Sequence, residues 1–157
     1  MNTFSNLYTS LLIIAISLLI GCATITEAPA KLDKQAKIFK SNPNYSQVYL
    51  YRNETLGSSL SIPVNVNCKY AGTTGPNSYF KFDLPEGKHT FITHDGESIL
   101  TIDTLPGEIY FIWQKIEWGL FSGGSSLHLV SDSEGRNGVL ESTLIDSNQS
   151  FKGQPRF

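Results

Sequence analysis

The residues able to perform catalytic or metal chemistry are few, and their spacing favours neither. There are three histidines, His89, His94 and His128. His89 and His94 are an odd number of residues apart in or near one strand, so they point to opposite faces and cannot chelate one ion together. Gly96-Glu97-Ser98 lacks the closing glycine of a G-x-S-x-G nucleophile elbow, and no glycine-rich nucleotide-binding motif occurs. We therefore expect surface or turn histidines, no catalytic residue, no metal site and no cofactor.

The thiol of Cys22 stands in a different setting, at the end of an apolar run. Leu19-Ile20-Gly21-Cys22 resembles the bacterial lipobox, in which the cysteine receives a diacylglyceryl group and the chain is cleaved before it. The resemblance implies cleavage between Gly21 and Cys22 and membrane attachment through lipid on Cys22. Each buried methylene contributes about 0.8 kcal/mol, so two or more acyl chains give stable anchoring.

The length of the apolar run supports a signal peptide over residues 1–21. Leu7 to Ile20 would cover roughly 21 Å as a helix, whereas a bilayer core is about 30 Å thick. The run is thus too short to span a membrane well and has the size of a signal-peptide core. An uncleaved signal anchor and an ordinary secretory signal are the alternatives, because Met1–Ser10 contains no lysine or arginine.

Ala23 follows the cysteine where aspartate would direct retention in the inner membrane of enteric-type bacteria. We therefore expect a lipid-anchored protein of the bacterial cell envelope, at the outer membrane and facing the periplasm. The charge pattern argues against nucleic-acid binding, since the net charge is −2 and the basic residues cluster only between Lys31 and Lys40. No paired cysteine spacing indicates zinc, and Cys68 is left as a single thiol.

The mature chain is expected to comprise a tether over 22–45 with weak helix around 34–39, a β-rich domain over 46–145 and a tail over 146–157. Alternating or continuous β-forming residues predict strands at 48–51, 62–66, 79–84, 88–93, 98–103, 108–116 and 126–131. The spacing predicts an all-β, mainly antiparallel domain, a small sandwich or barrel, with a short C-terminal helix. That helix would be capped by Asp132 or Ser133 and end near Ser142, although Gly135 and Gly138 weaken it.

Several local features refine this prediction. Pro63 cannot donate a ladder hydrogen bond, which favours an edge position for its strand. Residues 109–113 are apolar on both faces, which indicates a central strand. Leu105-Pro106-Gly107-Glu108 has glycine third, as in a type II turn. The glycine-rich stretch 72–76 opens no helix and is expected to be a loop.

The order of three segments resembles the bacterial family called "domain of unknown function 2846". They are Val48-Tyr49-Leu50-Tyr51-Arg52, Asn77-Ser78-Tyr79-Phe80 and Leu84-Pro85-Glu86-Gly87-Lys88-His89-Thr90-Phe91. The resemblance covers roughly residues 36–144. It implies a sandwich-like domain with frequent lipoprotein anchoring and no established activity.

Cys68 departs from the family pattern, in which a tight Asn-Gly or Asp-Gly hairpin turn stands at this place. The family comparison puts Cys68 at an exposed turn. Strand alternation instead puts it on the apolar face with Val66, and this buried or semi-buried position is the one we favour from the residues, because cysteine suits a positive φ poorly.

The segment 117–126 joins two predicted strands and carries Trp118, Leu120 and Phe121 between glycines. If exposed, these side chains would contact a partner or the membrane; if folded back, they would cover one end of the core. We expect a non-catalytic docking lipoprotein whose partner is membrane lipid through Cys22 and another envelope protein or peptidoglycan. The alternative is an envelope enzyme or enzyme inhibitor with a cleft built from distant residues.

Overall fold

The computed structural model describes residues 25–55, 60–93, 98–118 and 123–147. Along the chain these residues form two short helices and nine strands. The elements are α2 (Ala30–Ala36), β1 (Ser46–Arg52), β2 (Ile62–Val66), β3 (Lys69–Thr74), β4 (Ser78–Leu84), β5 (Gly87–Thr93), β6 (Ser98–Thr104), β7 (Ile109–Trp118), β8 (Gly123–Val130), α3 (Asp132–Leu140) and β9 (Thr143–Leu144).

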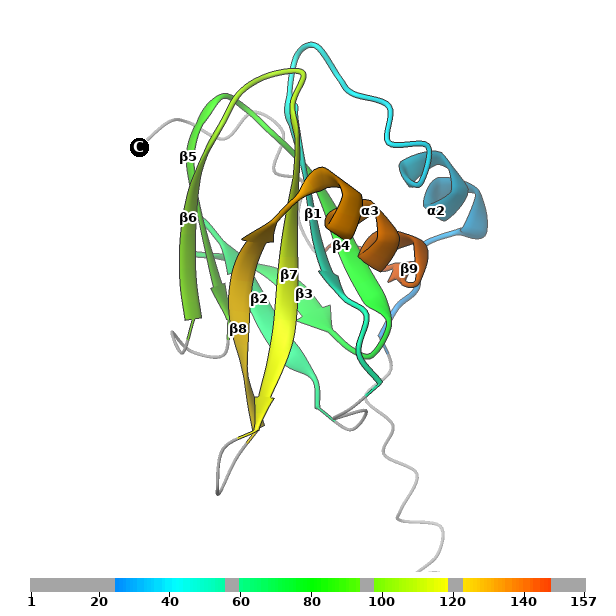
Figure 1. Cartoon of the computed structure of the whole chain (residues 1–157), viewed down its shortest axis with the longest axis vertical. Coiled ribbons are helices and arrows are strands. Elements are labelled where there is room, and N and C mark those ends of the chain that lie inside the picture. The colour runs from blue at the N-terminus through cyan, green and yellow to red at the C-terminus, as the bar shows by residue number, and fades with distance from the viewer. Residues whose placement is uncertain (1–24, 56–59, 94–97, 119–122, 148–157) are drawn as a thin grey trace, which may run out of the picture.

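The strands form two open sheets that face each other (Figure 1). One sheet has the order β8-β7-β1-β4-β9, and the other has the order β3-β2-β5-β6. Neighbours run antiparallel except for β1 with β7 and β4 with β9, which are parallel. Both helices cover the outer face of the five-stranded sheet (Figure 1). The predicted β-rich, sandwich-like domain with a short C-terminal helix is confirmed.

Alternation along the strands explains how the layers are held together. Val48, Leu50, Phe80 and Phe82 point between the sheets and form the main core with residues such as Phe91. Burying one such side chain stabilises the fold by about 1.5–3 kcal/mol. The side chains that alternate with them point outward, under the helices, where Tyr49, Tyr51, Tyr79 and Phe111 form a second, aromatic cluster.

Strand β1 is therefore buried along its whole length, and β7 lies inside the sheet as its two apolar faces predict. The type II turn at Leu105–Glu108 is also confirmed: Gly107 has φ +84°, and the Glu108 amide donates to the Leu105 carbonyl at 3.2 Å. None of the helices formed by the described residues is long and apolar enough to cross a membrane.

Helix α3 begins one residue earlier than predicted. Its N-cap is Ser131, whose hydroxyl accepts from the Glu134 amide at 3.4 Å. The two glycines that weaken the helix on propensity both face the sheet. A Cβ atom at Gly135 would overlap the ring of Phe111, and one at Gly138 would overlap the ring of Tyr51. The glycines thus let the helix approach the aromatic cluster closely.

Two strand predictions are wrong. β2 is not an edge strand, because β3 and β5 flank it. Within β2 only Val64–Val66 pair with β5, so Pro63 lies beyond that ladder and its missing amide costs no hydrogen bond to β5. The stretch read as a loop is in part strand β3, in which Gly72 makes room for Phe80: a Cβ there would lie 2.8 Å from the Phe80 Cζ.

The buried position favoured for Cys68 is also wrong. Asn67 and Cys68 form the two-residue turn between β2 and β3, with φ of +51° and +61°. Both residues therefore leave the strand alternation, and the Cys68 thiol is exposed. The turn resembles the tight primed turns that usually contain Asn-Gly.

The described part of the expected tether, residues 25–45, packs against the domain. The Ala28 amide donates to the Leu144 carbonyl at 2.9 Å, and the Asp146 amide donates to the Thr26 carbonyl at 3.2 Å. Residues 26–28 thereby extend the sheet beyond β9, a pairing we call the terminal clasp. The helix of this region is α2, somewhat earlier than the predicted 34–39. The described residues 25–45 are therefore part of the folded unit.

Candidate functional site

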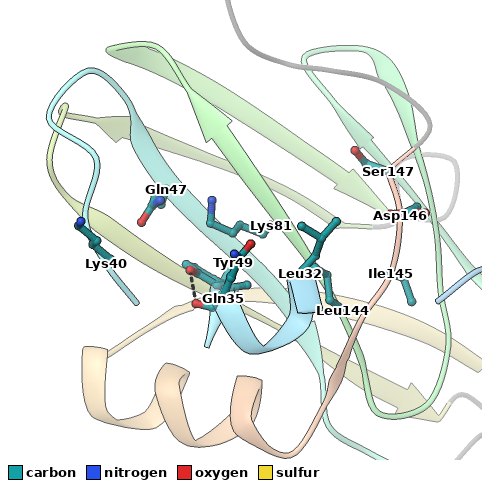
Figure 2. A pocket seen from close by; sticks show the side chains of 11 residues that line it. Leu32, Gln35, Lys40, Gln47, Tyr49, Lys81, Leu144, Ile145, Asp146 and Ser147 are labelled. Carbon is teal, nitrogen blue, oxygen red and sulfur yellow. Dashed lines mark hydrogen bonds between the residues drawn. The ribbon is translucent and has the colours of Figure 1, made fainter. Parts of the chain in front are cut away.

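A pocket of about 330 Å³ opens between α2 and the outer face of the five-stranded sheet (Figure 2). Tyr49 and Lys81 come from β1 and β4, and α2 and the 144–147 segment form its walls. The lining residues are Leu32, Gln35, Ala36, Lys40, Gln47, Tyr49, Lys81, Leu144, Ile145, Asp146 and Ser147.

Hydrogen bonds fix the floor of the pocket. The Tyr49 hydroxyl donates to the Ala36 carbonyl at 2.8 Å, and burial raises the pKa of this hydroxyl well above its ordinary value. Lys81 Nζ donates to Asp83 Oδ1 at 2.6 Å. With the Gln47 amide turned so that donors meet acceptors, its oxygen accepts from Lys81 Nζ at 3.2 Å and its nitrogen donates to the Lys40 carbonyl at 2.8 Å. Lys81 is thus held in place by two partners at the pocket wall.

The pocket lies beside the part of β4 that follows its short pairing with β9. β9 pairs only with Ser78 and Tyr79, and the Ile145 amide donates to the Tyr79 carbonyl at 3.0 Å before the chain turns toward Thr26. Because backbone groups on one edge recur every second residue, those of Lys81 and Asp83 point the same way as those of Tyr79. Among the described strands, β9 pairs with β4 on this side, and that pairing ends at Tyr79, next to the pocket.

Asp33 fixes α2 over this site. Its carboxylate accepts from Lys37 Nζ at 2.9 Å, from the Leu144 amide at 2.9 Å and from the Tyr79 hydroxyl at 3.0 Å. Burial opposes ionisation of Asp33, but these donors and the Lys37 charge outweigh it, so the pKa of Asp33 lies below its ordinary value. Lys37 also donates to the Ser142 carbonyl at 2.6 Å. One carboxylate thereby joins α2, β4 and β9.

The histidines singled out in the sequence lie outside the pocket where they are described. His89 is buried, with Nε2 2.8 Å from the Pro85 carbonyl and Nδ1 2.9 Å from Asn67 Nδ2, which assigns the ring proton to Nε2. It ties two turns together rather than lying at the surface. His128 is exposed on β8 beside Ser126, and His94 is outside the described residues. The described residues contain no cluster of three or more potential metal ligands.

The predicted lipidation and contact residues fall mostly outside the described structure. This holds for Gly21 and Cys22, and for Leu120 and Phe121. Trp118 is the last residue of β7 and pairs with Gly123 of β8, although its side chain is not described. The expected connection between two strands is thus a hairpin whose strands are longer than predicted.

Sequence reasoning missed a chain of buried polar side chains between the sheets. Thr74 donates to Gln114 Oε1 at 2.5 Å, Gln114 Nε2 donates to Ser125 at 3.3 Å, and Ser125 donates to Thr93 at 3.1 Å. All four side chains are buried, and each forms a hydrogen bond with the next. These bonds matter because an unpaired polar group is costly in a region of low dielectric. Arg52 is fully buried nearby on β1 and donates from Nη1 to the Leu60 carbonyl at 2.7 Å. Gln114 within an apolar strand was the one available signal.

Comparison with known proteins places the chain in a family. It is 33% identical over 131 residues to a protein of Haemophilus influenzae (strain ATCC 51907 / DSM 11121 / KW20 / Rd), covering 81% of this chain and 78% of that protein. The chain belongs to that protein's family. This relative is described only as an uncharacterized protein, so the family supplies no activity. No family model and no solved structure matches the chain.

Proposed function

We propose that the chain is a lipid-anchored envelope lipoprotein that acts as a non-catalytic binding module. The observation that carries the binding role is the pocket of about 330 Å³ beneath α2, with the exposed side chains of Gln35 and Lys40 at its rim. A concave site with a few convergent polar groups is suited to receive a ligand or a partner's side chain. The family resemblance noted in the sequence is in keeping with this role.

The lining of the pocket supports binding over acid–base or nucleophilic chemistry. Among the described lining residues there is neither a histidine nor a cysteine to act on a substrate. The Tyr49 hydroxyl and the Lys81 ammonium are already engaged, by the Ala36 carbonyl and by Asp83. Gln35, Lys40 and Asp146 remain exposed around the opening, where they can contact a partner.

The anchoring role rests on the lipobox at 19–22 and the apolar run before it. Mass spectrometry of the N-terminal peptide from membranes should show Cys22 as the first residue, carrying acyl chains. The Cys22→Ala variant should keep its signal peptide and carry no diacylglyceryl group. A natural protein that starts at another residue, or that carries no lipid, would refute the anchor.

The binding role is tested by photocrosslinking in cells. A photoreactive amino acid at Gln35, on the pocket rim, should give a specific adduct, whereas one at Lys88, exposed on the other sheet, should give none. Adding Lys81→Ala should remove the Gln35 adduct without lowering protein abundance, because it changes the pocket wall. Equal adducts at Gln35 and Lys88, or an adduct indifferent to Lys81→Ala, would contradict this assignment.

A further inference from the structure

The position of Ile25, the first described residue, limits where Cys22 can lie relative to the domain. Its side chain packs on Gly75, where a Cβ atom would overlap it, and against the inter-sheet core. Gly75 lies in the turn between β3 and β4, and its amide donates to the Ser78 hydroxyl at 2.9 Å. Ser78 pairs with Arg52 at the end of β1, and Thr74 pairs with Ile62 at the start of β2. Ile25 therefore lies at one end of the sandwich, which we call the near end.

The hairpin of β7 and β8 extends past the other strands at this same end (Figure 1). β1 and β7 are in register as far as Tyr51 and Trp113, after which β7 continues for five residues to Trp118. At about 3.3 Å per residue this continuation covers roughly 16 Å. Along the same strand axis, the turn that Ile25 contacts lies one or two residues beyond Tyr51. This displacement is roughly 3–7 Å. The strand ends of the hairpin thus project roughly 10 Å beyond Ile25.

Glu54 supports this projecting part. Its carboxylate accepts from the Ile116 amide at 2.7 Å, which joins the segment after β1 to the projecting strand. Along the hairpin, cross-strand pairs run from Phe111 with Val130 to Trp118 with Gly123. The hairpin is thus a continuation of the sheet and is held at a fixed height relative to Ile25.

Covalent geometry limits how far Ile25 can be from the lipid. Three residue steps separate Cys22 from Ile25. A fully extended chain spans at most about 3.6 Å per residue, so the link reaches no more than roughly 11 Å. That reach equals the projection of the hairpin beyond Ile25. If the link between Cys22 and Ile25 is fully stretched, the described ends of β7 and β8 lie level with Cys22. If the link is less extended, these strand ends reach the lipid headgroups.

We propose that the sandwich stands end-on against the bilayer, with its near end and the β7–β8 hairpin in contact with the lipid surface. This inference rests on lipid attachment at Cys22, the proposed anchor. Ile25 and the most projecting described strands share one end, which favours contact of this end with the membrane. The opposite end, which carries the Leu105–Glu108 turn and the start of α3, points away from the membrane.

Energy transfer from two labelled positions to dye-labelled headgroups tests the orientation. The lipidated full chain, carrying Cys68→Ser, is reconstituted in vesicles of phosphatidylethanolamine and phosphatidylglycerol. One variant has Thr55→Cys, one residue after Glu54 at the near end, and the other has Leu105→Cys at the opposite end; both positions are exposed. β7 separates the two levels by roughly 30 Å. We expect transfer from residue 55 to be several-fold more efficient than transfer from residue 105.

Equal transfer from the two positions, or stronger transfer from residue 105, would overturn the end-on orientation. A matched pair with twelve Gly and Ser residues inserted after Ala23 should bring the two efficiencies together, because such a link has a mean reach of roughly 20 Å. An unchanged difference in that pair would refute the role given to the short link. Failure of the anchor itself is recognised separately, since mass spectrometry of the same preparation would then show no lipid on Cys22.

Discussion

Helix α3 depends on two glycines for its contact with the sheet, and Gly138→Ala tests this dependence. A Cβ atom at Gly138 would lie 2.6 Å from Cδ2 of Tyr51 and closer still to two other ring atoms. Real Cβ contacts are longer than 3.0 Å, so either the helix or the ring must move. The ring has little freedom, because Tyr51 is 2% exposed. The same holds at Gly135 with respect to Phe111, which is 1% exposed.

Two opposing effects set the size of the change. Forcing an extra methyl group into a filled interior costs about 1–3 kcal/mol. Alanine favours a helix over glycine by about 1 kcal/mol, which offsets part of this cost. Because the added Cβ would meet three ring atoms closer than 3.0 Å, the upper part of the cost range applies, and we expect Gly138→Ala to destabilise the domain by about 1–2 kcal/mol. For a domain of this size that lowers the melting temperature by about 4–8 °C, measured by circular dichroism.

Asn137→Ala provides the matched control in the same helix. Asn137 is exposed, so the substitution adds no contact and improves helix propensity by a few tenths of a kcal/mol. Its melting temperature should equal or slightly exceed that of the natural protein. If Gly138→Ala and Gly135→Ala were as stable as Asn137→Ala, the close approach of α3 to the aromatic cluster would not be what these glycines provide.

Three further predictions concern single side chains. Asp33→Ala should lower the free energy of unfolding in urea by about 2–3 kcal/mol, since it leaves three donors without their charged acceptor. Because the folded-state pKa of Asp33 is depressed, its stabilisation is complete above the unfolded pKa of about 4 and is lost as pH falls through the folded value. Asp33→Asn should therefore flatten the decline in stability below pH 4, and an unchanged acid profile would contradict the assignment. His89→Ala should cost about 2 kcal/mol in the same urea assay by removing the partners of Pro85 and Asn67, whereas exposed His128→Ala should be neutral.

Periodicity predicted most of the strands because each has one face in the core. Val64 and Phe82 lie where alternation puts them, and the continuous apolar run at 109–113 correctly indicated a central strand covered on both sides. The glycine at 107 identified its turn type, because only the backbone conformation of that one residue was at issue. Sequence patterns were therefore sufficient for strands and turns whose conformation depends on neighbouring residues.

The errors arose where a contact distant in sequence decides the structure. Gly72 looks like a loop residue, yet it lies in a strand because Phe80 needs the space. Gly135 and Gly138 weaken a helix on propensity, yet packing against Phe111 and Tyr51 requires them. The pocket could not be predicted at all, since Lys81 and Gln35 meet only through the placement of α2 by Asp33. Nothing in the order of the residues signals that placement.

The terminal clasp also determines the order in which the domain can be completed. It joins Ala28 to Leu144 and closes a loop of more than a hundred residues, whose entropy must be lost before the clasp contributes anything. A chain made from its N-terminus therefore has residues 25–45 unclasped until its last strand is available. During that interval the distance between Cys22 and the first strand corresponds to more than twenty residues, with a mean span of roughly 26 Å. Closure of the clasp then shortens the connection to three residues. With the lipid on Cys22 that we propose, completion of folding and approach to the membrane would be one event.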